Sequence, residues 1–186
     1  PKHIEIQVLA DSHGNVVSVT QTLGGGFGSS VAMGDTGIFL NNMAYWFDLE
    51  EGAPNQIAPG KRVDFCLAPV QVHKGGRFLL SLSTPGSWGI LQTTPQMLIN
   101  VLDFGMNVQE AIEAPRLKVI KGRNIEMEER FPYHIRKALE TKGHQIDTIA
   151  PWSPSVGGAH GIQFDKNNGV FQGGADPRRD GYAIGW

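Results

Sequence analysis

The residues whose chemistry stands out are Gly86 and Ser87, at the junction between a predicted strand and a predicted helix. The strand, residues 77–83, is largely apolar, and it leads through Thr-Pro-Gly-Ser into a mostly apolar segment of helix length. A helix start leaves backbone N–H groups without intrahelical acceptors, and such groups favour negative charge. Because glycine lets a substrate approach the backbone closely, this junction could form an oxyanion hole. The alternative is a tight turn that needs glycine for its geometry alone.

Other polar residues are weaker candidates for chemistry. None of the six histidines occurs at a spacing typical of zinc sites, so the sequence predicts no metal. The glycine-rich run 24–28 lacks the Gly-Lys-Ser/Thr ending of a phosphate loop, and no cofactor is expected. Residues 176–180 mix both charges and are interpreted as a structural ion-pair loop rather than an anion site. Cys66 is expected to lie buried and unreactive in a strand. Thr22 ends a strand, where its hydroxyl is either structural or a support for a catalytic group.

Composition limits the classes of function. The chain has 186 residues, of which 40% are hydrophobic, and this predicts a single domain over residues 1–186. The net charge is -2, and no run of lysine and arginine suggests binding to nucleic acid. No apolar run approaches the roughly 20 residues of a membrane span, so no membrane partner is expected. One cysteine excludes an intrachain disulfide and leaves the compartment open, with the cytoplasm slightly favoured.

The elements that position these residues follow from hydrophobic periodicity. Together they predict helices packed on stacked, mostly antiparallel sheets. At Pro95 two alternatives stay open: a helix kinked there at a cost of about 3 kcal/mol, or a helix that begins with Thr94 as N-cap. The predicted strands are 4–8, 16–22, 37–40, 65–73, 77–83, 117–120, 124–129, 145–149, 159–164 and 169–172, and the other predicted helices are 107–112 and 132–142.

Several short segments are informative because of their order and spacing along the chain. They are residues 11–22, 27–29, 35–42, 58–62, 84–86, 103–111, 114–116 and 175–178. In order and spacing they resemble the small, C-terminal subunit of gamma-glutamyltransferase-like N-terminal nucleophile hydrolases, with the acylase-like branch closest. The resemblance implies the α+β class and a four-layer αββα sandwich, completed by a large subunit cut from the same precursor by autoprocessing. It also implies a hydrolase or acyltransferase whose substrate is a small-molecule amide.

The same resemblance implies roles for individual residues. Thr22 matches a threonine whose hydroxyl supports the nucleophile, and Gly86 and Ser87 match the glycine pair whose N–H groups hold the oxyanion. The family's nucleophile is a threonine freed at the N-terminus of the small subunit. Its position falls on Ile4 or, in a second alignment, on Pro1, and neither has a hydroxyl. Two hypotheses follow: an amidohydrolase with a different or unseen nucleophile, or a catalytically inactive relative that binds a small molecule or a partner.

The resemblance also predicts a changed substrate pocket. Phe65 and Cys66 take the place of the serine pair that grips a glutamyl carboxylate. Tyr45 and Trp46 replace the acidic residues that hold its amine, and Gly24 replaces an asparagine. Charged groups of a γ-glutamyl substrate would lose their partners here, at a high desolvation cost. We therefore expect these residues to suit a bulky apolar or aromatic acyl group.

Overall fold

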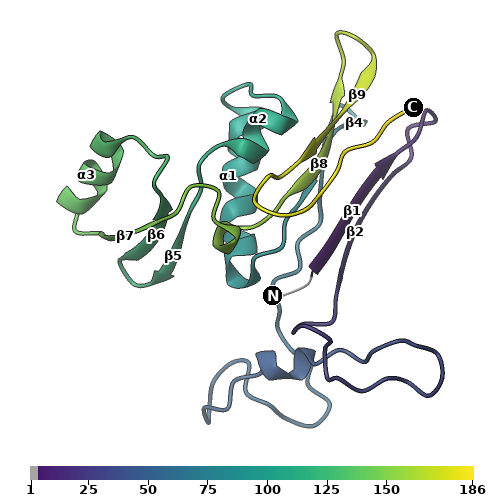
Figure 1. The fold of residues 1–186 in the computed structure, drawn as a ribbon, viewed down its shortest axis with the longest axis vertical. Coiled ribbons are helices and arrows are strands. Elements are labelled where there is room, and N and C mark those ends of the chain that lie inside the picture. The colour runs from purple at the N-terminus through teal and green to yellow at the C-terminus, as the bar shows by residue number, and fades with distance from the viewer. Residues whose placement is uncertain (1–3) are drawn as a thin grey trace. The chain divides into compact units, whose positions relative to one another are not determined.

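Figure 1 shows a computed structural model of the chain, which describes residues 4–186. The chain divides into two compact units. The smaller unit comprises Thr20–Leu67 together with residues up to Glu5, and the larger unit comprises Ile6–Val19 and Ala68–Trp186. Both units include part of one β-hairpin, and the single-domain organisation stays a prediction.

Strands and helices lie close to the ranges that periodicity predicts. The strands are β1 (Ile4–Ala10), β2 (Val16–Thr22), β3 (Val70–Lys74), β4 (Arg77–Ser83), β5 (Leu117–Lys121), β6 (Asn124–Glu128), β7 (Gln145–Ile149), β8 (His160–Asp165) and β9 (Val170–Ala175). The helices are α1 (Ile90–Leu102), α2 (Val108–Glu113) and α3 (Tyr133–Thr141), with short 3-10 helices η1 (Met43–Trp46), η2 (Ser87–Gly89) and η3 (Pro154–Val156). Within residues 4–186, no helix has the length and apolar character needed to cross a membrane.

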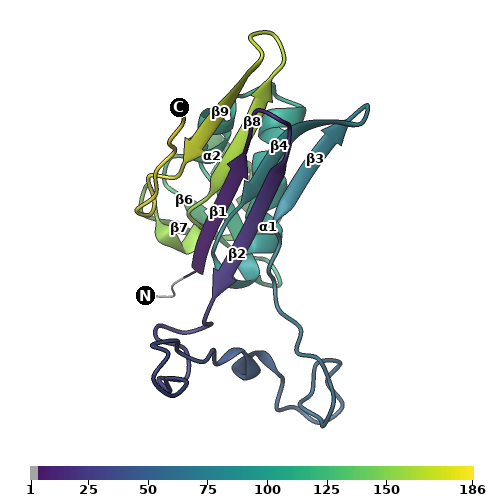
Figure 2. The ribbon, with the colours of Figure 1, turned by 90° about the vertical axis from the view of Figure 1, so that its right-hand side faces the viewer.

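A four-stranded antiparallel sheet, in the order β3-β4-β8-β9, is the centre of the larger unit. In that unit α1 and α2 cover one face of the sheet, and the β1–β2 hairpin lies against the other face (Figures 1 and 2). Hydrogen-bond contacts join the hairpin to the sheet: Gln71 Nε2 donates to the Val16 carbonyl at 3.1 Å, and His160 Nδ1 lies 2.9 Å from the Ile6 carbonyl oxygen. The resulting order of layers is helix, sheet and hairpin.

A second sheet, β5-β6-β7, packs beside α1. β5 and β6 are antiparallel, whereas β6 and β7 are parallel and are connected through α3. Gln96 on α1 donates to the Leu117 carbonyl at 2.8 Å and accepts from the Leu117 N–H at 3.1 Å, and Gln92 makes the same pair of bonds with Val119. These side-chain amides satisfy the backbone of β5 and fix it to the helix.

The hydrophobic core lies between the four-stranded sheet and its two helices. Its buried members are Leu80, Leu82, Met97, Val101, Val108, Ala111, Ile112 and Ala159. Burial of each large side chain contributes roughly 1.5–3 kcal/mol. Because β4 and α1 both contribute to this core, the turn that joins them has fixed ends.

The smaller unit is largely irregular, and the strand predicted at 37–40 is wrong. Only Phe39 pairs there, through an isolated bridge to Ala32, and Ile38 is 58% exposed. The apolar residues at 38–40 therefore do not form a strand. The other isolated bridge joins Asp48 to Gln56.

Two further expectations need correction around prolines. The strand predicted from Phe65 begins only at Val70, because Pro69 has no N–H to donate to a ladder. Cys66 is buried as expected but lies in this irregular segment rather than in a strand. Of the two alternatives at Pro95, the start at Thr94 is ruled out and a helix that contains the proline is found, since α1 begins at Ile90 and continues through Pro95.

Candidate functional site

The turn at Gly86 and Ser87 joins β4 to α1 through η2. The chain is buried up to this turn, since Ser83 and Thr84 are each 1% exposed, whereas Gly86 and Ser87 are half-buried. Gly86 has φ 139° and ψ 22°, a conformation that favours glycine. Ser87 has φ 58°, in the left-handed region that non-glycine residues rarely adopt. The chain thus leaves the core through two consecutive residues of positive φ.

The two amides of this turn are available for hydrogen bonding. Within residues 4–186, the N–H groups of Gly86 and Ser87 have no acceptor. Their carbonyls are used in η2, where Gly86 accepts from Gly89 at 3.1 Å and Ser87 accepts from the Ile90 N–H. Two adjacent donors at a half-buried turn could bind an oxyanion, and the catalytic role of these residues stays a prediction.

A second loop supports the turn from behind. Gly157 follows η3 and has φ 112°, and its Cα would lie 3.5 Å from a Cβ added to Gly86. A side chain at position 157 would collide with Thr84 Oγ1 and would lie 2.9 Å from Arg116 Nη1. Close contact between these two backbone segments therefore requires glycine at 157.

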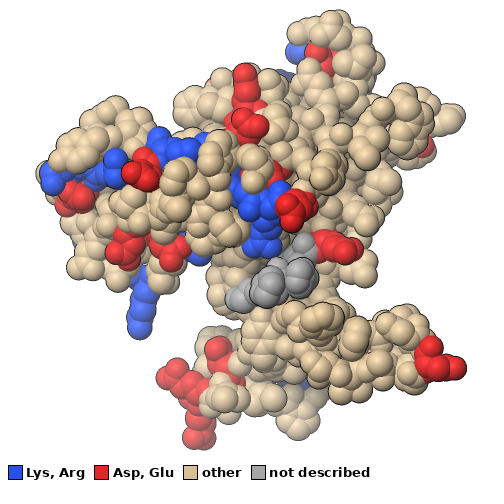
Figure 3. Space-filling model, in the orientation of Figure 1, with Lys and Arg blue, Asp and Glu red and all other residues tan. Residues whose placement is uncertain are grey.

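Buried charges hold this supporting loop. Basic and acidic side chains are interspersed over the surface in Figure 3, but four charged residues are almost fully buried. They are Arg116 (0% exposed), Glu128 (0%), Asp176 (2%) and Arg178 (5%). A buried charge persists only when it is paired and hydrogen-bonded.

The buried charges are all paired with one another. Arg116 binds Asp176 through Nη2, and it also donates to the backbone carbonyls of Ile112 and Val156, each at 2.9 Å. Arg178 lies 2.6 Å from Glu128 Oε2 and 3.0 Å from Asp176 Oδ1. This confirms the interpretation of the Asp176 and Arg178 segment as a structural ion-pair loop.

The pKa values of the two buried carboxyls reflect this pairing. Burial alone would raise the pKa of Asp176, but the charges of Arg116 and Arg178 outweigh burial and hold that pKa below its ordinary value. Burial would likewise raise the pKa of Glu128, and hydrogen bonds from Arg178 and from the Arg116 N–H lower it overall. Both groups are therefore ionised near neutral pH.

These shifts predict acid sensitivity with a defined sign. Because the folded pKa values are lowered, the unfolded chain binds more protons than the folded chain in acid. The contribution to the free energy of unfolding should be complete above the ordinary values of 3.8 for Asp176 and 4.5 for Glu128, and lost as the pH falls through the lower folded values. Urea unfolding at a series of pH values measures this.

An exposed carboxylate provides the control. Asp165 also has a lowered pKa, through hydrogen bonds from Asn168 and Asn167. In Asp165→Asn we expect most of the decline in stability below about pH 4.5 to remain, because exposed groups contribute little. If the decline disappears in this variant, the buried pair is not its source.

Thr22 lies in the smaller unit, whereas Gly86 and Ser87 lie in the larger one. Its Oγ1 accepts a hydrogen bond from the Gly24 N–H at 3.0 Å. Gly24 has φ 91°, and a Cβ there would collide with Asn42 Oδ1. Asn42 Oδ1 also accepts from the Gly25 N–H at 2.8 Å. The space beside Gly24 is thus filled by Asn42, a residue to which sequence analysis gave no role.

The predicted pocket residues also belong to the smaller unit. Tyr45 and Trp46 lie in η1 with ring centroids 5.4 Å apart, and Tyr45 is 50% exposed. Phe65 is 38% exposed, whereas Cys66 is 4% exposed. The aromatic rings therefore offer apolar surface, and the thiol of Cys66 is largely covered.

Neither residue matched to the nucleophile supplies a hydroxyl in the described structure. Ile4 is the first residue of β1. Pro1 lies outside the described residues.

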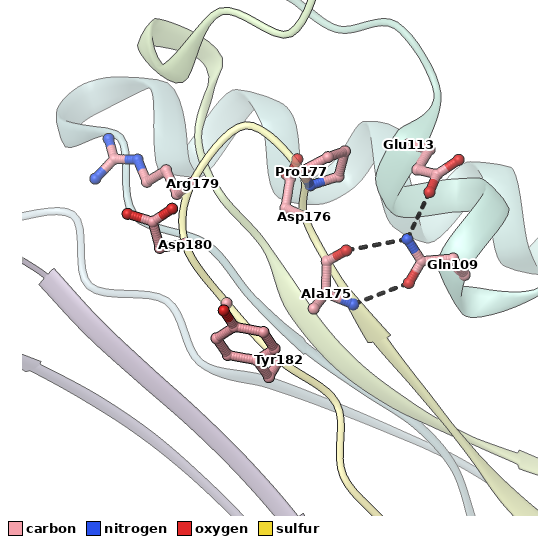
Figure 4. Close-up of a pocket in the computed structure, with 9 residues that line it drawn as sticks. Gln109, Glu113, Ala175, Asp176, Pro177, Arg179, Asp180 and Tyr182 are labelled. Carbon is pink, nitrogen blue, oxygen red and sulfur yellow. Dashed lines mark hydrogen bonds between the residues drawn. The ribbon is translucent and has the colours of Figure 1, made fainter.

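A polar cavity of about 280 Å³ lies at the end of β9 (Figure 4). Gln109 lines it on the α2 side, donating to the Ala175 carbonyl at 3.0 Å and to Glu113 at 2.7 Å, and accepting from the Ala175 N–H at 2.9 Å. Tyr182 and Asp180 also line it, whereas none of the predicted site residues does. The side-chain amide of Gln109 is thus committed to holding β9 against α2.

Sequence analysis missed the residues that support the turn. Arg116 lies in one of the segments that carried the family resemblance, but no role was attached to it. Glu128 ends an alternating strand, and Gly157 begins a Gly-Gly pair. A charged residue at the end of a buried strand was the available signal.

Comparisons with known proteins agree with this architecture. The sequence matches the family model described as "Gamma-glutamyltranspeptidase" over residues 5–186. It is 41% identical over 177 residues to the acylase ACY 1 proenzyme of Pseudomonas sp. (strain SE83), covering 95% of this chain and 31% of that protein. It is 38% identical over 184 residues to the glutathione hydrolase-like YwrD proenzyme of Bacillus subtilis (strain 168), covering 95% and 34%.

A solved structure is similar over nearly the whole chain. A mutant of Helicobacter pylori gamma-glutamyltranspeptidase gives a TM-score of 0.82 at 31% identity, covering 94% of this chain and 99% of that chain. This confirms the predicted α+β class and the sandwich of the N-terminal nucleophile hydrolases. The chain spans about a third of the length of the curated relatives it matches. It therefore belongs to the gamma-glutamyltranspeptidase family and corresponds to the small-subunit region of its proenzymes.

Proposed function

We propose that this chain forms part of an amidohydrolase or acylase that cleaves amides with a bulky apolar acyl group. The observation that supports this most directly is the pair of N–H groups at Gly86 and Ser87, which have no acceptor within residues 4–186. Attack on an amide carbonyl moves an electron pair onto its oxygen. Fixed donors aimed at that oxygen lower the barrier, and each contributes roughly 3 kcal/mol.

The turn provides such donors without reorganisation. Its ends are fixed by β4 and α1, and the loop at Gly157 supports it from behind. In this proposal the attacking group adds to the carbonyl carbon, and the oxyanion accepts from the N–H groups of Gly86 and Ser87. The intermediate then collapses, the carbon–nitrogen bond breaks, and the amine leaves with the proton that the attacking group has given up. Water then hydrolyses the acyl group and returns a proton to the nucleophile.

Thr22 is proposed to support the attacking group. Its hydroxyl oxygen accepts from the Gly24 N–H at 3.0 Å, which fixes the side chain at the end of β2. We propose that the attacking group itself is supplied by residues before Ile4.

The proposed acyl preference depends on the smaller unit. Tyr45, Trp46 and Phe65 present aromatic surface, and none of them has a charge to pair with a carboxylate or an ammonium group. An aromatic acyl group would gain apolar burial of roughly 25 cal/mol per Å² against such rings. A similar protein at 41% identity, the acylase ACY 1 proenzyme, is by its name also an acylase.

We also propose a large subunit from the same precursor as the partner. The relatives carry the name proenzyme, and this chain covers about a third of each. In the described residues the β1–β2 sheet has only two strands, so each strand has one edge without a ladder. Strands of a partner could complete that sheet.

Two amides test the proposed activity. The protein, expressed from its complete native gene, is incubated with phenylacetyl-p-nitroanilide and with γ-glutamyl-p-nitroanilide, and mass spectrometry identifies the N-terminal residue of each product chain. We expect kcat/KM to be at least about tenfold higher for the aromatic substrate, since a missing polar contact costs more than a methylene.

The outcomes separate the alternatives. Faster release from the glutamyl substrate would contradict the apolar pocket. No release from either substrate by an uncut polypeptide would contradict an enzyme altogether and favour the catalytically inactive relative.

A further inference from the structure

Thr84 is a buried polar residue that the proposed chemistry does not use directly. It lies between β4 and the turn, and it is 1% exposed. Its hydroxyl donates to the Pro85 carbonyl at 2.9 Å and accepts from the Gly158 N–H at 3.2 Å. The hydroxyl therefore donates to a backbone group of the turn and accepts from a backbone group of the loop behind it.

The Pro85 carbonyl, which accepts from the Thr84 hydroxyl, belongs to the same peptide group as the Gly86 N–H, one of the two proposed oxyanion donors. The Pro85 carbonyl and the Gly86 N–H are opposite ends of a single planar peptide unit, and this peptide is trans. In such a unit the N–H points away from the carbonyl. Fixing the direction of the Pro85 carbonyl therefore fixes the direction of the Gly86 N–H.

The loop behind the turn prevents this peptide from moving away. Position 157 has no room for a side chain, since a Cβ there would lie 3.1 Å from the Pro85 carbonyl oxygen and would collide with Thr84 Oγ1. The preceding carbonyl, Val156, accepts from buried Arg116 at 2.9 Å. The ring of Pro85 also restricts φ of Pro85, the residue that supplies the carbonyl of this peptide.

We propose that Thr84 is a positioning residue whose hydroxyl orients the Gly86 N–H toward the carbonyl oxygen of the substrate. This inference rests on the proposed function. Its hydrogen bond also polarises the peptide, which makes the N–H a better donor. Loss of the hydroxyl should weaken binding of the oxyanion more than binding of the uncharged substrate, so the effect falls on kcat rather than on KM.

Three variants of the protein expressed from its complete native gene test this. Thr84→Val keeps the shape but removes both hydrogen bonds, and Thr84→Ser restores the hydroxyl. Ser81→Ala is the matched control, because Ser81 is also buried and its hydroxyl also donates to one backbone carbonyl, that of Val70 at 3.0 Å. For each variant kcat and KM for the aromatic anilide and the midpoint of urea unfolding are measured.

We expect Thr84→Val to lower kcat by about tenfold or more. This effect should be smaller than that of losing a whole oxyanion donor. KM should change by less than about twofold. Thr84→Ser should recover kcat to within about threefold of the wild type. Ser81→Ala should shift the urea midpoint by an amount similar to Thr84→Val, with kcat unchanged. If Thr84→Val does not accumulate, Thr84→Ala removes the same hydroxyl with less volume and serves in its place.

The failures of the two proposals are distinguishable. An inert wild-type protein contradicts the proposed function and this inference with it. If the wild type is active and Thr84→Val keeps the wild-type kcat, this inference alone is contradicted. The same holds if Thr84→Val and Ser81→Ala lower kcat by similar factors. A Thr84→Ser variant as slow as Thr84→Val also overturns it, because the hydroxyl would then not be the group responsible.

Discussion

Replacing Gly86 with alanine should lower kcat by about 100- to 1000-fold, the effect of losing one oxyanion donor. The space beside Gly86 would accept a methyl group, since its nearest neighbour would be Gly157 Cα at 3.5 Å. The backbone would not, because φ is 139°. An L-residue must rotate away from that conformation, and this rotation redirects the N–H. Steady-state kinetics on the aromatic anilide measures the loss.

Two variants control for strain and for the second donor. Gly122→Ala changes another glycine of positive φ, 59°, in the β5–β6 hairpin, where nothing lies within 4 Å of an added Cβ. It should cost stability without lowering kcat. Ser87→Gly keeps the backbone N–H and relieves a left-handed residue, which costs roughly 1–2 kcal/mol. We expect it to unfold at higher urea with kcat within about threefold of the wild type. A Gly86→Ala variant as active as Gly122→Ala would rule out the oxyanion role.

Replacing Arg116 with methionine should lower the free energy of unfolding by about 3–5 kcal/mol. Arg116 is fully buried and pairs with Asp176, and it also donates to the carbonyls of Ile112 and Val156. Methionine fills a similar volume but removes the cation of this pair, while Asp176 keeps its ion pair with Arg178. The cost comes mainly from the buried Asp176 carboxylate, which has lost its ion pair with Arg116.

Urea unfolding of matched variants isolates this effect. Lys137→Met removes an exposed partner of Glu140, a pair separated by 2.8 Å, and should change the free energy of unfolding far less, because water screens exposed ion pairs. Adding Asp176→Asn to Arg116→Met should recover roughly 1–3 kcal/mol relative to the sum of the single changes, because the two residues interact directly. A loss as small as that of Lys137→Met would show that the buried network contributes no stability.

Local patterns predicted most elements because each depends on neighbouring residues. The short helix after residue 107 is an example. Asn107 accepts from the Glu110 N–H at 2.9 Å, and Glu110 accepts from the Asn107 N–H at 2.9 Å, a capping box visible in the sequence. At Pro95 local reasoning left two alternatives, because it could not show that Leu91 is exposed. The Leu91 carbonyl, which loses its helical donor at Pro95, can then be hydrated.

The site could be predicted only in part. Thr-Pro-Gly-Ser after an apolar strand indicated a turn with available amides, and the structure has that turn. The hydrogen bond that the Thr84 hydroxyl accepts from the Gly158 N–H joins residues that are distant in sequence. No periodicity signals such a contact.

The residues that pair with the buried charges could not be predicted from the sequence either. Alternation along β6 places Ile125 and Met127 in the interior and would place Glu128 outside. Glu128 is instead fully buried, because Arg178, 50 residues further along the chain, pairs with it. Long-range pairing of this kind overrides the local pattern.

The separation in sequence of these charges has a consequence for how the protein folds. Arg116 and Asp176 are 60 residues apart. During synthesis α1, α2 and β6 leave the ribosome well before the segment that neutralises Arg116. A core that closed early would enclose a cation without its counter-ion, which is strongly unfavourable. Docking of β9 and the residues after it should therefore be a late, coupled step, and partly folded chains that lack it should be the species that chaperones and proteases encounter.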